Sequence, residues 1–138
     1  MSLDAVRIKA EQLAIAALAA AHPGVKLRTQ NVPFTQPHGE HWVDFKLSPG
    51  KRSPESFGAN ALYRAFGVLN FTVLAPEGSG TKTLISIADT IEKAFINRRY
   101  ALGADGYVTF ECVTQRDRGN MNTFAAWGVM VEFKHSAS

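Results

Sequence analysis

The chain has 138 residues and a mass of 15.0 kDa, with 46% hydrophobic residues, 20% charged residues and a formal net charge of +3. These values are typical of one globular domain that buries about two-thirds of its surface, so we expect a single domain over residues 1–138. The one cysteine excludes an internal disulfide and a multi-cysteine zinc site, and no apolar run reaches the about 20 residues of a membrane-spanning helix. No basic segment followed by an apolar one opens the chain, so we expect no secretion signal.

Apolar residues recur at helical spacing from residue 3 to residue 21, and this pattern predicts a helix that ends at the His-Pro-Gly tripeptide 22–24. Two isoleucines, Ile8 and Ile15, lie off its main apolar face. They are either isolated surface residues or a second contact stripe on the helix.

The next part of the chain is predicted to form strands. Residues 25–28 are compatible with a short edge strand, and the alternation over residues 41–47 predicts a second strand. Proline, glycine and serine dominate residues 48–60, which predicts a long loop. Residues 62–75 alternate most clearly, and one of their two faces carries no charge. Half of the opposite face is also apolar, so that face is covered or meets a partner; it holds Arg64, Phe66, Val68, Asn70, Thr72 and Leu74.

The last third of the chain predicts one helix and two strands. The helix covers residues 82–97, and the strands cover 107–115 and 123–134, with a polar turn at 115–122 between them. We expect the ends, 1–2 and 135–138, to be frayed. The economical fold is α+β: a four- to five-stranded, mainly antiparallel sheet with two helices on one face, in the order α-β-β-α-β-β.

Candidate chemical sites are incomplete. Segment 77–83 joins a strand to a helix as a phosphate-binding loop does, but Pro76 and Thr81 occupy the places of its two glycines. His38 and His41 have no further histidine or cysteine pair to complete a zinc site. Cys112 alternates with apolar residues, which predicts a buried, inert thiol. We therefore predict no enzyme and no catalytic, metal or cofactor-binding residues.

The charged clusters and the apolar face point to protein partners. The basic clusters are short and carry no interleaved aromatic residues, so we expect neither a nucleic-acid partner nor a membrane partner. Apolar residues on the second face of the predicted sheet favour assembly. From this we predict an oligomer interface at Arg64, Phe66, Val68, Leu74, Phe124 and Met130. The polar, basic loops are either partner contacts or loops without a partner; the predicted contact residues are Lys51, Arg52, Arg116, Asp117, Arg118 and Asn120.

Residues 66–80 read Phe-Gly-Val-Leu-Asn-Phe-Thr-Val-Leu-Ala-Pro-Glu-Gly-Ser-Gly, and Leu84, Ile87, Ile91 and Phe95 follow. This stretch resembles the tail terminator (tail completion) proteins of long-tailed bacteriophages. The resemblance extends over residues 3–134 and includes the opening helix and the closing strand.

The resemblance implies a hexameric ring that caps the tail tube, stops its polymerisation and presents a surface for head joining. The implied partners are further copies of the chain, the tail tube protein and the head-side connector protein. The implied location is the tail end or neck of a virion assembled in the host cytoplasm. Two alternatives stay open: another phage neck or head-completion protein, or a small non-viral α+β domain that binds a ligand or is an enzyme.

Overall fold

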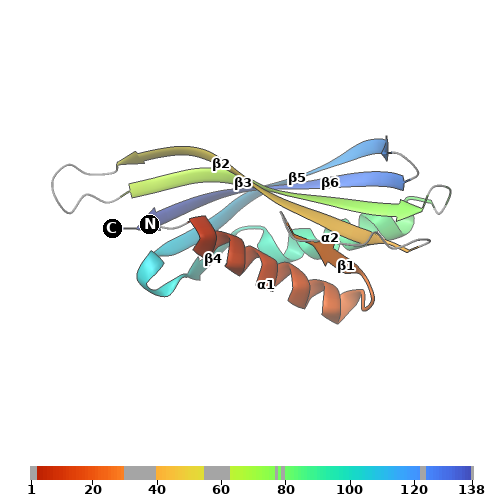
Figure 1. The fold of residues 1–138 in the computed structure, drawn as a ribbon, viewed down its shortest axis with the longest axis horizontal. Helices are drawn as coiled ribbons and strands as arrows, with labels where there is room; N and C mark the ends of the chain where they lie inside the picture. Colours follow the sequence, from red (N-terminus) through yellow and green to blue (C-terminus); the bar gives the residue numbers. More distant parts are fainter. Residues whose placement is uncertain are drawn as a thin grey trace.

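The computed structural model describes residues 3–29, 40–54, 63–76, 78, 80–121 and 124–137. Both helices lie on one side of a single strongly twisted sheet (Figure 1). The elements follow the order α1 (Leu3–Ala21), β1 (Lys26–Arg28), β2 (Trp42–Pro54), β3 (Tyr63–Pro76), α2 (Lys82–Phe95), β4 (Arg98–Ala101), a 3₁₀ segment η1 (Gly103–Asp105), β5 (Tyr107–Met121) and β6 (Phe124–Ala137). Neither helix has the length and hydropathy that crossing a membrane requires.

The sheet has six strands in the order β1-β2-β3-β6-β5-β4. Among the strands that the structure describes, only the β1–β2 pair is parallel, so the α+β class and the two helices on one face are confirmed. The expected four to five strands and the order α-β-β-α-β-β are wrong, because β1 precedes the predicted strands and because the chain turns after Phe95, before the predicted helix end at residue 97, into the edge strand β4. Asn97 makes this turn possible: its φ of 52° is in the left-handed region that asparagine tolerates, and its N–H donates to the Glu111 carbonyl.

Three strands run further than the sequence predicts. The predicted loop 48–60 begins later, since β2 pairs with β3 as far as Pro54; residues 55–60 lie outside the described residues. The polar stretch 115–121 belongs to β5 and is not a turn, because backbone pairing with β6 needs no apolar side chains. The tail predicted to be frayed is strand β6 to Ala137, and His135 in it is fully buried. Residues 1–2 and 138 are outside the described part.

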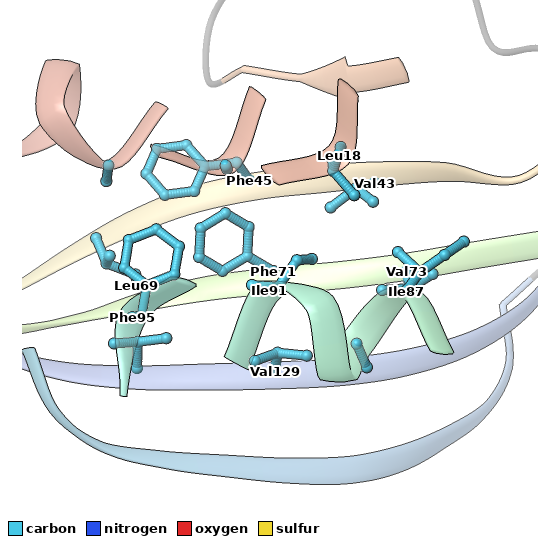
Figure 2. Close-up of a cluster of buried hydrophobic side chains, with 14 of the residues drawn as sticks. Leu18, Val43, Phe45, Leu69, Phe71, Val73, Ile87, Ile91, Phe95 and Val129 are labelled. Atoms are coloured by element: carbon cyan, nitrogen blue, oxygen red, sulfur yellow. The ribbon is translucent and has the colours of Figure 1, made fainter. Parts of the chain in front are cut away.

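The main core lies between the sheet and the helices (Figure 2). Phe71 on β3 packs between Phe45 of β2 and Phe95 of α2, with ring centroids 4.9 Å and 5.3 Å away. Phe95 continues this line to Phe110 on β5 in an edge-to-face contact at 4.9 Å. Helix α2 buries one face at helical spacing, which consists of Leu84, Ile87, Ala88, Ile91 and Phe95.

Helix α1 buries small residues in a narrow line. Its buried residues are Val6, Ala10, Ala14 and Leu18. The predicted bounds of this helix are confirmed, whereas Ala21, which helical spacing puts on the apolar face, is exposed in the last turn. Short side chains on the inner side let this helix lie close to its neighbours, and the outer side is left to solvent.

Candidate assembly surface

The face of the sheet opposite the helices is the candidate site. Cross-strand partners share a face of an antiparallel sheet, and the β3–β6 register pairs Phe66 with Lys134, Val68 with Glu132 and Asn70 with Met130. This outer face carries all six residues of the predicted oligomer interface, namely Arg64, Phe66, Val68, Leu74, Phe124 and Met130.

One end of the outer face is already packed. Trp42 and Leu74 are 2% and 6% exposed, and Ala126 is buried beside them. The Trp42 and Phe124 rings meet edge to face, with their centroids 5.9 Å apart. The Arg28 guanidinium lies 5.9 Å from the centroid of the Trp42 ring. Leu74 therefore stabilises this small second core and offers little surface to a partner.

The centre of the outer face has a basic hollow of about 190 Å³, bordered by Arg116, Arg118, Thr114 and Met130. Its floor is open because Gly128 has no side chain: a Cβ there would stand 2.8 Å from Arg118 Cδ. Arg116 is the cross-strand partner of Gly128. Both arginines are exposed, and no carboxylate of the described residues pairs with either one.

The rest of the outer face carries apolar residues interleaved with charged ones. Phe66, Val68 and Met130 are each half-buried, and we name these three residues the outer patch. Next to them, Lys134 Nζ and Glu111 Oε1 form an ion pair at 2.8 Å, and the exposed Glu132 lies opposite Val68. Half-buried apolar residues with charged neighbours are compatible with a protein–protein contact.

The predicted partner-contact residues lie on strands and not on loops. Lys51 and Arg52 belong to β2 near a register shift between Pro49 and Arg52. The exposed residues Arg116, Asp117, Arg118 and Asn120 belong to β5. Asp117 pairs with Trp127 on the helix-facing side of the sheet and accepts a hydrogen bond from the Gly119 N–H at 2.8 Å. Of the four residues on β5, Arg116 and Arg118 border the basic hollow.

The prediction of a buried thiol at Cys112 is wrong, since this residue is exposed. A register shift between Phe110 and Val113 breaks the alternation on which that prediction depended. His41 is half-buried, and burial, with a smaller contribution from His22, lowers its pKa. Within the described residues, no three histidine, cysteine or acidic side chains converge on a metal position; His38 lies outside them.

The segment that resembled a phosphate-binding loop is a strand-to-helix turn in the described positions. Gly78 and Gly80 have φ values of +87° and +84°, which glycine adopts without strain. Thr81 precedes α2 and makes no side-chain capping bond.

The model of one protein family, described as phage tail terminator protein, matches residues 3–131. The chain belongs to the phage tail terminator family. Terminators are structural proteins of the virion and not enzymes, so the chain is a virion component that contacts other virion proteins. The interpretation as a non-viral domain or enzyme is therefore wrong.

Solved structures with a similar fold include the following two. One is 21% identical, with a TM-score of 0.74 over 98% of this chain and 96% of its own. The other belongs to the virion of a native gene transfer agent particle; it is 17% identical, with a TM-score of 0.57 over 93% of this chain and 92% of its own. No curated protein matches the chain.

Proposed function

We propose that this terminator assembles as a hexameric ring at the tail end of the virion. The ring caps the tail tube, stops its polymerisation and presents the surface to which the head-side connector joins. Assembly takes place in the host cytoplasm before the head is joined. The number six comes from the resemblance to the terminator family and not from the contacts of one subunit.

The outer patch is the observation that carries this proposal. Phe66, Val68 and Met130 lie on a sheet face that neither helix covers (Figure 1). Apolar area that stays half-exposed on a small protein favours burial against another subunit, by about 25 cal/mol for each Å² removed from water. The gene transfer agent chain with the same fold is also part of an assembled virion particle.

The basic residues supply the contacts to other virion proteins in this proposal. Arg116 and Arg118 are exposed beside the outer patch and pair with no carboxylate of the described residues. They match an acidic surface on the tube protein or on the connector. Lys51 and Arg52 add two positive charges on β2, and Asp117 and Asn120 complete the predicted contact set.

Native mass and tail length test the function together. We expect light scattering over a concentration series to give the mass of a ring for the unchanged chain. Met130→Arg buries a charge in the contact, so it should give monomers with an unchanged melting temperature. In a phage that depends on this variant, tails should grow beyond their normal length because nothing caps the tube. Normal rings and normal tails from the Met130→Arg variant would refute the proposal.

A further inference from the structure

The basic hollow on the outer face of the sheet is built by two arginines and one glycine. Arg116 and Arg118 are two residues apart on β5 and border the same hollow, as alternate residues of a strand do. Gly128 on β6 is the cross-strand partner of Arg116 and is buried. A Cβ at this glycine would stand 2.8 Å from Arg118 Cδ and 3.3 Å from its Cγ. The stem of Arg118 therefore lies over the glycine, and this position depends on the absence of a side chain there.

Neither guanidinium of the hollow has a counter-charge on the described part of the subunit. The sheet row through Gly128 reaches Asp44 on β2, but that carboxylate pairs with Arg28 at 3.2 Å. Asp117 lies between the two arginines in sequence, but its position in β5 is on the helix-facing side of the sheet. Two like charges on alternate residues of one strand face repel each other, and an anion held between them removes this repulsion.

The hydrogen-bond donors around the hollow suit a carboxylate. Each guanidinium presents a planar fork of N–H groups that can bind both oxygens of a carboxylate in parallel. Thr114, two residues before Arg116 on β5, adds a hydroxyl to the same border. The hollow has a volume of about 190 Å³, which is room for several waters that an entering side chain displaces. It can therefore take the end of one acidic side chain.

We propose that the basic hollow binds one acidic side chain, a glutamate or an aspartate, of another virion protein. The carboxylate lies between Arg116 and Arg118, and the glycine at position 128 keeps the second arginine in place for it. This inference rests on the proposed function and makes it more specific, because the contact is one built site and not a general attraction between charged surfaces. The hollow lies on the sheet face that neither helix covers, so a partner can reach it (Figure 1).

A second copy of this chain is a poor source of the carboxylate. Asp117 accepts a hydrogen bond from the Gly119 N–H. Six more acidic side chains also bond within the subunit, namely Asp4, Glu11, Asp44, Asp89, Glu92 and Glu111. Of the other two acidic side chains that the structure describes, Glu132 lies on the same outer face as the hollow and Glu40 precedes β2. A partner of different sequence is therefore the favoured source.

A nucleic-acid backbone does not suit this surface. A nucleic acid gains affinity from a series of cations, one for each phosphate that it neutralises. On the outer face, Lys134 pairs with Glu111, and Arg28 pairs with Asp44. The exposed Glu132 on the same face adds a negative charge that repels phosphate. Acidic and basic side chains thus alternate over this face, which favours a single carboxylate over a polyanion.

Peptide probes test the hollow directly. We expect an acetylated Gly-Glu-Gly amide to shift the NMR signals of the Arg116 and Arg118 Nε–H groups and of the Gly128 amide. The shifts should saturate in the millimolar range, as expected for one carboxylate held by charge-assisted hydrogen bonds. The neutral Gly-Gln-Gly amide, which has the same shape, should leave these signals unchanged at matched salt.

Gly128→Ala is the decisive variant, because it keeps both charges and only displaces the stem of Arg118. We expect it to bind the glutamate peptide about tenfold more weakly, which corresponds to the loss of one charge-assisted contact. Ser136→Ala is the matched control: it is a small change on the same face of β6, away from the hollow, and should bind normally. If Gly128→Ala fails to fold, Arg118→Lys provides the same test, since lysine keeps the charge but lacks the fork.

The outcomes separate this inference from the proposed ring. Equal shifts from the two peptides, or normal binding by both Gly128→Ala and Arg118→Lys, would overturn the hollow as a carboxylate site. Tighter binding of a single-stranded oligothymidylate at the same signals would assign the hollow to nucleic acid and also overturn it. Light scattering reports the ring independently, so a ring that ignores the glutamate peptide refutes only the hollow. A monomeric chain that binds the peptide refutes only the ring.

A complementation assay connects the hollow to the virion. Gly128→Ala should give fewer joined, infectious particles while the mass of the assembled protein stays unchanged. Ser136→Ala should give normal particle numbers. Normal particle numbers from a Gly128→Ala chain that no longer binds the peptide would overturn the assignment of the hollow to a virion partner.

Discussion

The ring of Phe133 on β6 covers the backbone of Gly67, its cross-strand partner on β3. A Cβ built at Gly67 would stand 2.5 Å from Phe133 Cζ and 2.9 Å from the Ser48 carbonyl oxygen on β2. A side chain at position 67 would therefore meet both the Phe133 ring and the backbone of β2. The ring of Phe133 fills the space that a side chain at position 67 would occupy, on the helix-facing side of the sheet.

We expect Gly67→Ala to destabilise the subunit by about 1–3 kcal/mol, as overpacking of a tight core does. Chemical or thermal unfolding of the purified chain measures this loss. Combining Gly67→Ala with Phe133→Leu should recover only part of it, because the Ser48 carbonyl belongs to the backbone and cannot move aside. A Gly67→Ala variant as stable as the unchanged chain would show that β2 and β6 can separate at this point.

The side chain of Gln115 joins the β5–β6 hairpin to α2. Its Nε2 donates to Asp89 Oδ1 at 2.9 Å and to Glu92 Oε1 at 3.3 Å, and its Oε1 accepts from Trp127 Nε1 at 3.0 Å. We expect Gln115→Ala to lower the free energy of unfolding by about 1 kcal/mol, since these hydrogen bonds are partly exposed. Gln115→Glu should cost more, because it adds a third carboxylate beside two others, and high salt should reduce the difference. Equal melting temperatures for both variants at low salt would contradict this account.

His41 makes the stability of the subunit depend on pH. Its Nε2 is buried without a hydrogen-bond partner among the described residues, and burial lowers its pKa from the ordinary value of 6.5. The unfolded chain therefore binds a proton at a higher pH than the folded chain does. The stability due to neutral His41 is complete above about pH 6.5 and declines as the pH falls towards the lower, folded pKa.

Melting curves between pH 5 and 8 test this dependence. We expect the melting temperature of the unchanged chain to fall on the acid side, and His41→Gln to flatten that fall. Asp44, whose pKa burial raises, is present in both proteins, so its contribution cancels in the comparison. Parallel pH profiles for the two proteins would rule out His41 as the group responsible. Since His41 has no assigned contact in assembly, His41→Gln should still complete tails at neutral pH.

Charge reversal at Arg116 and Arg118 should weaken joining to the tube or the connector without unfolding the subunit. Both side chains are exposed, and surface changes of this kind move stability by about 0.5 kcal/mol or less. We expect fewer joined, infectious particles in a complementation assay with Arg116→Glu combined with Arg118→Glu. Lys51→Glu combined with Arg52→Glu should also give fewer joined, infectious particles.

The matched control for this experiment is Arg98→Glu, an exposed arginine on the edge strand β4 and outside the predicted contacts. The defect of the double variants should be largest at low salt. Salt screens interactions between exposed charges, over a distance of about 10 Å at 0.1 M. Normal particle numbers with both double variants would refute these residues as partner contacts.

The sequence by itself determined the elements whose periodicity is local. The bounds of α1 follow from apolar spacing and from the Pro-Gly end, and the buried face of α2 follows from five residues at helical positions. The two faces of β3 follow from strict alternation, so Phe66 and Val68 of the outer patch could be predicted from residues 62–75, and Met130 from the alternation over residues 123–134. The resemblance carried by residues 66–80 led to the family whose model then matched residues 3–131.

Only the tertiary structure decided what depends on pairing between distant segments. Backbone pairing draws polar residues such as Asn120 into β5, and a register shift exposes Cys112, because strand hydrogen bonds are indifferent to side-chain polarity. Trp42 buries Leu74 from a neighbouring strand, which no local pattern of β3 contains. The sequence placed Ile8 and Ile15 off the main apolar face of α1, but only the packed layers show that the described part of the subunit leaves them exposed.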